Sequence, residues 1–378
     1  MDATTSRRPK RPLWAEIDPA ALAHNLEYVR RLAGKRQLIA SVKANAYGHG
    51  AVEFARLLEA HGVQTLWTGG IGEAIAIREA GARARILLFA GYLPADIPAL
   101  LDRGFVPTIY DRDGAAAVSR AARAPTPIYI KVDSGLGRLG VPLPEAEAFI
   151  HETAARPNIV IEGIYSHLPL GDASGRDWAL AHYREFTALL GRLASQGIRP
   201  PMTQIWASSG LLAKMPDVCN AVCVGHLLYG LSPVSEQIAP ATDLRPALSA
   251  IKTRLIHVAH HAAGEDLAIG GSYGGKNARI IGVAPLGLGD GMRNLAPDQH
   301  LTLSLRGQRV PVLGVSLEHT TLDLTEIGFA EVGDEVTVVG HNGNSFKDLA
   351  CAFGCSELEA VMSFGGRLAI RDRAQRII

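Results

Sequence analysis

Short apolar runs alternate with segments of helical periodicity over the first two thirds of the chain. An apolar run followed by a segment in which apolar residues recur every three to four positions predicts a buried strand and then an amphipathic helix. The runs recur at a spacing near that of one strand plus one helix, which is typical of a parallel sheet. They occupy residues 38–42, 63–68, 85–90, 105–110, 127–132, 159–165, 203–207 and 221–229.

The number of these runs bears on the fold class. A closed (β/α)8 barrel, the TIM barrel, uses eight strands in one series, whereas a doubly wound sheet usually stops earlier. Helical segments are predicted between the runs, at residues 71–80, 94–103, 143–155 and 176–195. We therefore predict an α/β protein in which a basic tail at 1–13 precedes a TIM barrel at 14–248.

The periodicity changes after Leu248. Short β-branched runs separated by turns predict a mostly β C-terminal domain over residues 249–378. The predicted strands are 249–257, 278–284, 300–305, 309–315, 320–325, 335–339 and 367–371, with short helices at 345–352 and 356–362.

Composition narrows the function classes. The formal net charge is +1 and 47% of the residues are hydrophobic, which gives no support for nucleic acid or an anionic membrane surface as a partner. No apolar run approaches the length of a membrane span, so a cytoplasmic protein is expected. The four cysteines Cys219, Cys223, Cys351 and Cys355 lack the Cys-x-x-Cys spacing of a zinc site. Reduced thiols and no metal site are predicted.

Lys43 stands where the first predicted strand gives way to a turn and then to a helix. In a barrel of parallel strands, such turns lie on the face that carries active sites. A lysine amine there can form a Schiff base with a carbonyl cofactor. A solvated lysine at the end of a strand is the alternative interpretation.

Other strand ends carry similar groups. The fifth run leads from Lys131 into a glycine-rich loop with Asp133 and Arg138, the sixth ends at His167, and the seventh at Ser208. Taken singly, Lys131 and Asp133 could form a surface ion pair, His167 could be a core histidine, and Ser208 could begin an ordinary turn. Ser208 and the glycine after Ser209 have the composition of a phosphate site.

The β domain contains one isolated candidate. Tyr273 has two glycines on each side, at positions 270–271 and 274–275. A loop of this kind permits close approach to another surface and cannot bury the tyrosine in its own core. A turn in which the tyrosine has no chemical role is the alternative.

The string Val42-Lys43-Ala44-Asn45-Ala46-Tyr47-Gly48-His49-Gly50 resembles the lysine motif of alanine racemases, which use pyridoxal 5'-phosphate (PLP). The order of barrel and β domain resembles that family over almost the whole chain. The resemblance implies that Lys43 carries PLP and acts as one catalytic base. It implies that Tyr273 is the second base, supplied by the partner subunit of a homodimer with shared sites. Two bases on opposite faces of the α-carbon suit racemisation of an L- or D-amino acid.

The resemblance also assigns roles to single positions. Lys131 matches a lysine that is carbamylated in some family members and lies near the substrate. Arg138 matches the arginine that contacts the substrate carboxylate and the phenolic oxygen of the cofactor, and the backbone amide of Leu317 is expected at the same carboxylate. His167 matches a histidine hydrogen-bonded to the catalytic tyrosine. The cofactor contacts implied are Lys43, Tyr47, Arg138, His167, Ser208, Cys223, Gly225 and Tyr229.

Several positions depart from the family pattern. Cys223 replaces an arginine that faces the pyridine nitrogen, and Leu288 and Leu358 replace tyrosines at the substrate entrance and the phosphate. The pair Leu317-Glu318 replaces a Met-Asp pair. A wider, more apolar mouth predicts a substrate that is alanine or a larger amino acid. With a thiol in place of arginine, retro-aldol cleavage of a β-hydroxy amino acid is an alternative reaction. A PLP carrier without catalysis is a third interpretation, although carriers resemble the barrel alone.

Overall fold

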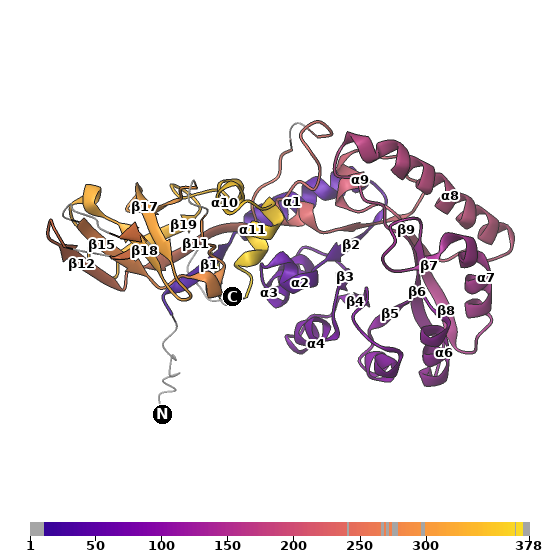
Figure 1. Cartoon of the computed structure of the whole chain (residues 1–378). Helices are drawn as coiled ribbons and strands as arrows, with labels where there is room; N and C mark the ends of the chain where they lie inside the picture. The colour runs from indigo at the N-terminus through magenta and orange to yellow at the C-terminus, as the bar shows by residue number, and fades with distance from the viewer. Residues whose placement is uncertain are drawn as a thin grey trace, which may run out of the picture. The chain divides into compact units, whose positions relative to one another are not determined.

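The computed structural model describes residues 11–239, 242–265, 268–269, 272–273, 279–295, 299–366 and 368–372 (Figure 1). Contacts divide the chain into two units. The first unit contains Pro19–Ala46 and Ala51–Pro246. The second contains the described residues of Met1–Asp18, Tyr47–Gly50 and Ala247–Ile378. The sequence predicted a barrel and then a mostly β domain, and this fold class is confirmed.

Over the described residues of the first unit, eight parallel strands pair in the order β10-β2-β3-β4-β5-β6-β8-β9 (Figure 1). A short strand, β7 (Val141–Pro142), pairs with β6 outside this series. The last predicted run ends as a strand at Val224 and continues as the 3-10 helix η3 (His226–Tyr229). The series consists of β2 (Gln37–Ser41), β3 (Thr65–Thr68), β4 (Arg85–Leu88), β5 (Val106–Ile109), β6 (Thr126–Asp133), β8 (Ile159–Tyr165), β9 (Met202–Gln204) and β10 (Ala221–Val224).

Amphipathic helices connect these strands. In α1, Leu22, Leu26 and Val29 are buried at intervals of three and four residues, so one apolar stripe packs inward while Arg30 and Arg31 occupy the last turn. The helices of this unit are α1 (Pro19–Ala33), α2 (Lys43–Tyr47), α3 (Ala51–Ala60), α4 (Ile71–Glu79), η1 (Pro94–Asp96), α5 (Ile97–Asp102), α6 (Arg112–Ala121), α7 (Leu143–Ala154), η2 (Ala173–Gly175), α8 (Arg176–Ser195) and α9 (Ser208–Leu212).

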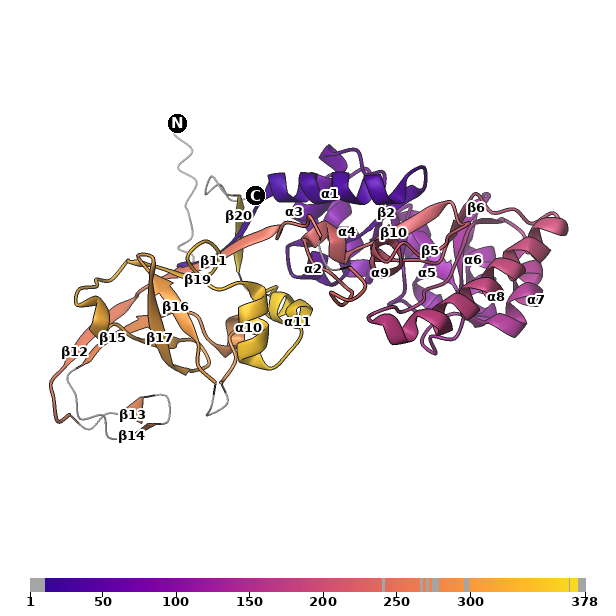
Figure 2. The ribbon, with the colours of Figure 1, turned by 90° about the horizontal axis from the view of Figure 1, so that it is seen from above.

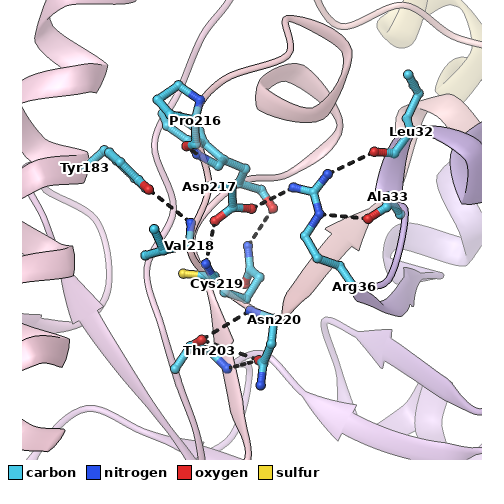
Figure 3. Close-up of polar contacts among 12 residues, drawn as sticks. Leu32, Ala33, Arg36, Tyr183, Thr203, Pro216, Asp217, Val218, Cys219 and Asn220 are labelled. Atoms are coloured by element: carbon cyan, nitrogen blue, oxygen red, sulfur yellow. Dashed lines mark hydrogen bonds and ion pairs between the residues drawn. The ribbon is translucent and has the colours of Figure 1, made fainter.

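Strands β9 and β10 stand at the two ends of the series, and Asn220 joins them at their N-terminal ends (Figure 3). The side-chain oxygen of Asn220 accepts a hydrogen bond from the amide of Thr203 at 2.8 Å, and its Nδ2 donates to Pro201 O at 2.7 Å. The carbonyl of Asn220 accepts from the amide of Gln37 at 2.8 Å. The side chain and the backbone carbonyl of Asn220, which directly precedes β10, therefore link three strands where the barrel comes together.

Arg36 fixes the same end of the barrel. Its guanidinium donates to Asp217 Oδ2 at 2.8 Å and to the carbonyls of Leu32 and Ala33 at 2.9 Å each (Figure 3). The side chain of Asp217 is 3% exposed, and its other oxygen accepts from the amide of Cys219 at 2.9 Å. Because each charged group is hydrogen-bonded, this buried pair holds α1 against the segment that leads into β10.

A second sheet builds the other unit, with the order β12-β15-β18-β17-β16-β19-β11-β1-β20 (Figure 2). Ser345 and Ser356 cap the two helices, and each accepts a hydrogen bond from the amide three residues on. The elements are β1 (Leu13–Ile17), β11 (Leu248–Arg254), β12 (His257–His261), β13 (Ala268–Ile269), β14 (Ser272–Tyr273), β15 (Arg279–Ala284), η4 (Leu288–Asp290), β16 (Thr302–Leu305), β17 (Gln308–Val315), β18 (Thr320–Asp323), η5 (Thr325–Ile327), β19 (Glu335–Val339), α10 (Phe346–Phe353), α11 (Glu357–Ser363) and β20 (Ala369–Asp372).

The first strand of the chain, β1, lies in this sheet, although it falls inside the range 14–248 that the sequence analysis assigns to the barrel. It pairs antiparallel with β11 and parallel with β20. All five residues of β1 are buried. A strand without a solvent-facing side needs neighbours along both edges, and β11 and β20 supply them.

A close backbone contact holds the segment Tyr47–Gly50 in this unit. A Cβ added at Gly365 would lie 2.5 Å from Gly48 Cα, and one added at Gly48 would lie 3.3 Å from Gly365 Cα. Gly48 has a φ of 84°, which side chains rarely adopt. Glycine is therefore required on both sides of the contact.

We predict that Gly365→Ala lowers the free energy of unfolding by about 1 to 3 kcal/mol, because the methyl group would force the two backbones apart. Gly366→Ala is the matched control, since no atom lies within 4 Å of its Cβ position. Calorimetric unfolding of the two variants measures the difference. Equal transition temperatures would show that the backbones yield without cost.

Candidate active site

Lys43 follows β2 and opens a turn of unusual hand. Residues 44–47 all have φ between 51° and 55°, in the left-handed helical region. Each non-glycine residue in that region costs about 1 to 2 kcal/mol, so surrounding contacts must hold the turn. Asn45 supplies two of them, because its amide donates to Glu73 Oε1 at 2.5 Å and its Oδ1 accepts from the amide of Ala51 at 2.9 Å.

Three cationic side chains lie around the ring of Phe89, the residue that directly follows β4. Lys131 Nζ lies 4.3 Å from the ring centroid, Lys43 Nζ 5.6 Å and Arg138 Cζ 5.7 Å. The negative face of an aromatic ring attracts cations at such distances. The structure thus brings Lys43, Lys131 and Arg138 together, as the convergence of strand ends predicts.

Burial and the neighbouring positive charges change the proton affinity of the two lysines. Burial lowers the pKa of Lys43, with Arg138 adding to the effect and Cys223 opposing it. Burial also lowers the pKa of Lys131 to about 7, with a further contribution from Arg138. An amine with a lowered pKa is uncharged in a larger fraction at neutral pH and can accept a proton.

Two further expected residues belong to the same electrostatic cluster. Burial, together with the charges of Lys131, Arg138 and Lys43, lowers the pKa of His167 to about 3, so the imidazole is neutral. Burial raises the pKa of Cys223 to about 12, against the opposing effect of Lys43 and Lys131. The mouth therefore holds a neutral thiol and a neutral histidine beside its cations.

Lys131 is the most demanding of these groups. Its residue is 1% exposed, and within the described part of the chain its Nζ has no hydrogen-bond partner. The rings of Phe89 and Tyr165 line it, the latter with its centroid at 5.5 Å. A buried amine without a hydrogen-bond acceptor among the described residues fits a site completed by an acidic or polar ligand.

Two groups that could contact an anion lie next to each other in the segments that follow β9 and β10. The amide of Gly225 donates to Ser208 Oγ at 3.1 Å, so the two expected phosphate contacts lie side by side. Tyr229 lies differently: its hydroxyl donates to the carbonyl of Ser41 at 2.7 Å, and its ring stacks on Phe54 at 4.7 Å. Tyr229 thus supports the end of the strand that carries Lys43.

The other unit carries the remaining expected residues. Tyr47 is 6% exposed in the left-handed turn, Leu358 lies in α11, and Leu288 and Leu317 are 38% and 67% exposed. The backbone of Tyr273 pairs with Ala268 in the ribbon β13-β14. The glycines 270–271 and 274–275 lie outside the described residues.

Arg11 connects the loops that carry the two exposed leucines. It donates to Asp290 Oδ1 at 2.8 Å and to the carbonyl of Glu318 at 2.6 Å. The backbone reinforces the link, because the amide of Leu288 donates to Ser316 O at 2.9 Å. Leu288 and Leu317 are therefore held on one rigid surface.

The described residues contain neither a membrane-spanning helix nor a metal-binding cluster. No helix there is long and apolar enough to cross a bilayer. No three or more His, Cys, Asp or Glu side chains gather there in a way that would hold a metal ion.

Comparison with known protein families gives the decisive observation. Residues 17–233 match the family model of the alanine racemase N-terminal domain, and residues 248–371 match that of the C-terminal domain. This chain belongs to the alanine racemase family. Family membership identifies it as a racemase, an enzyme of the isomerase class.

Individual relatives agree with the family models over nearly full length. The alanine racemase of Syntrophobacter fumaroxidans is 33% identical over 360 residues, covering 93% of this chain and 95% of its own. That of Desulfovibrio desulfuricans is 32% identical, covering 95% and 97%. The crystal structure of alanine racemase from Bacillus anthracis with bound L-Ala-P is 26% identical with a TM-score of 0.87, covering 98% and 97%.

Sequence reasoning missed Phe89 in this racemase. The residue follows an apolar strand and reads as one more core side chain. The cationic residues near several strand ends could have signalled it. Three positive charges in one mouth favour a neutral aromatic ring beside them. The hand of the turn after Lys43 left no signal, since alanine does not favour left-handed conformations.

We predict that Lys131 titrates near pH 7 in the cofactor-free protein, and that Arg138→Ala raises its pKa because a repelling charge is removed. Lysine Cε-labelled protein allows 13C NMR to follow each amine, with Lys131→Arg assigning the signal. Arg192→Ala is the control, since Arg192 pairs with Glu147 on the outer helices. An ordinary lysine pKa at position 131 would contradict the prediction.

Proposed function

We propose that this member of the alanine racemase family depends on PLP and interconverts L- and D-amino acids with Lys43 and Tyr273 as its two bases. The observation that carries the proposal is the position of Lys43. Its amine lies at the end of a barrel strand, has a lowered pKa, and shares the mouth with Lys131 and Arg138. Amines tuned in this way serve as catalytic bases.

The residues present fit PLP by their chemistry. Lys131 is a buried amine without a hydrogen-bond partner among the described residues, and Ser208 and Gly225 place a hydroxyl beside an amide. When bound, the cofactor disperses the negative charge that develops at the substrate α-carbon. Its proposed contacts are Lys43, Tyr47, Arg138, His167, Ser208, Cys223, Gly225 and Tyr229.

The chain's own groups would then divide the proton transfer. In one direction, the amine of Lys43 accepts the α-proton from one face while the hydroxyl of the partner subunit's Tyr273 donates a proton to the opposite face. In the reverse direction, the tyrosinate accepts and the Lys43 ammonium donates, so a homodimer with shared sites is part of the proposal. Arg138 orients the substrate carboxylate through charge-assisted hydrogen bonds, and the amide of Leu317 meets the same carboxylate.

We predict that Lys43→Ala and Tyr273→Phe are each inactive and complement one another when mixed. A mixed dimer with shared sites contains one site with both native bases, so random exchange restores about one quarter of the native rate. The rate of α-hydrogen exchange in heavy water measures the restored activity. Analysis of the products shows whether a β-hydroxy amino acid is cleaved instead. An inactive mixture of fully exchanged dimers would contradict a shared site.

Side-chain size is the second part of the proposal. With Leu288 and Leu358 in place of tyrosines, the entrance and the phosphate side of the pocket each lose a phenol ring and become more apolar. We propose a substrate that is alanine or a larger amino acid. Because a hydrophobic pocket distinguishes a methylene by only about 1 to 3 kcal/mol, the preference is graded.

We predict that Leu288→Tyr lowers kcat/KM for an amino acid with a branched side chain about tenfold, and that for alanine by less, since the ring refills the entrance. Val332→Tyr is a matched control, because Val332 is a 62% exposed residue of the same unit. Racemisation rates over a panel of amino acids measure both. A native enzyme that strongly prefers alanine would refute the wider substrate range.

A further inference from the structure

The loop that carries Arg138 is anchored at its base by its own residues. The carboxylate of Asp133 accepts hydrogen bonds from the amides of Gly135 and Gly137, at 3.0 Å and 2.9 Å. Ser134, which is 1% exposed, accepts from Ser166 Oγ at 2.9 Å. These contacts fix where the loop starts, while Arg138 itself is exposed near its far end.

The outer side of the loop rests on helix α8 at a single point. A Cβ at Gly135 would lie 2.6 Å from His182 Cδ2, 2.8 Å from His182 Nε2 and 3.1 Å from Trp178 Cζ2. These three nearest atoms all belong to two aromatic side chains. Next to this contact, a cavity of about 640 Å³ adjoins the loop, lined by Gly137, Pro142 and Leu143 among others. The nearest support of the loop at Gly135 therefore comes from α8.

The two side chains on α8 form a rigid platform. The ring of His182 stacks on that of Trp178 with centroids 4.1 Å apart and planes 28° apart. His182 Nδ1 also hydrogen-bonds with the carbonyl of Trp178 at 2.9 Å, which fixes the rotation of the imidazole. A stacked, hydrogen-bonded ring offers the loop a flat surface in a defined orientation.

We propose that His182, braced by Trp178, is a positioning residue that holds the glycine-rich loop so that Arg138 faces Phe89 and the two lysines. The consequence for catalysis rests on the proposed function, in which Arg138 orients the substrate carboxylate. The consequence for electrostatics does not, because Arg138 already acts on Lys131 in the chain alone. Neither His182 nor Trp178 contacts substrate in this proposal.

Three variants of the full-length protein test the proposal. His182→Ala removes the platform and enlarges the adjoining cavity. His182→Phe keeps a flat ring on Trp178 and should rescue the loop. His61→Ala is the matched control. His61 directly follows α3, and its Nδ1 makes the same kind of hydrogen bond with the carbonyl four residues earlier, at 2.8 Å.

In the cofactor-free protein, we expect the 13C signal of Lys131 to titrate at a higher pH in His182→Ala than in the native chain, because Arg138 moves away. The midpoint in His182→Phe and His61→Ala should stay at the native value. In the loaded enzyme, KM for the amino acid should rise about tenfold in His182→Ala alone, more than kcat falls.

Unchanged Lys131 titration and unchanged KM in His182→Ala would overturn the proposal. An equal shift in His61→Ala would also overturn it, because that result indicates general loosening of the barrel. A shifted titration without any racemase activity in the native protein would refute the proposed function and leave the positioning role intact. Circular dichroism of each variant establishes that it is folded.

Discussion

The crowding of positive charge into a buried barrel mouth is the constraint on which the site depends. Lys43, Lys131 and Arg138 all lie within 6 Å of the Phe89 ring. Removal from water and mutual repulsion both favour the uncharged amines. The ring offsets part of this cost without adding charge. An anionic group bound in the mouth would offset this repulsion, and without one each amine is uncharged in a larger fraction at neutral pH.

The scaffold holds these charges in place with contacts far from the chemistry. At the N-terminal ends of the strands, hydrogen bonds of Asn220 join the two ends of the strand series, and Arg36 holds α1 against the segment that leads into β10. At the opposite end, Lys43 leads into four consecutive residues of left-handed backbone. Strain of that kind persists only where neighbours over-determine the conformation, and Asn45 and Glu73 do so here. The contacts of the barrel stabilise the strained turn.

Much of this architecture could be predicted because it follows from chain periodicity. The eight barrel strands and the β domain arise from apolar runs that a sequence shows directly, and the meeting of Ser208 with Gly225 follows from the geometry of parallel strands. The sheet that takes in β1 could not be predicted, since its partners β11 and β20 lie more than 230 residues away. The contacts of Phe89 could not be predicted either, because the sequence around a single aromatic residue does not show which side chains lie next to it.

The replacement of arginine by Cys223 makes physical sense in this crowded mouth. A guanidinium on β10 would be a fourth cation beside Lys43, Lys131 and Arg138, and each added charge lowers the pKa of a neighbouring amine further. The thiol, whose pKa burial raises to about 12, is neutral and adds no such repulsion. Lys43 in this chain therefore keeps a higher proton affinity than it would beside an arginine. In the proposed mechanism, a Lys43 amine of higher proton affinity would remove a weakly acidic α-proton more readily.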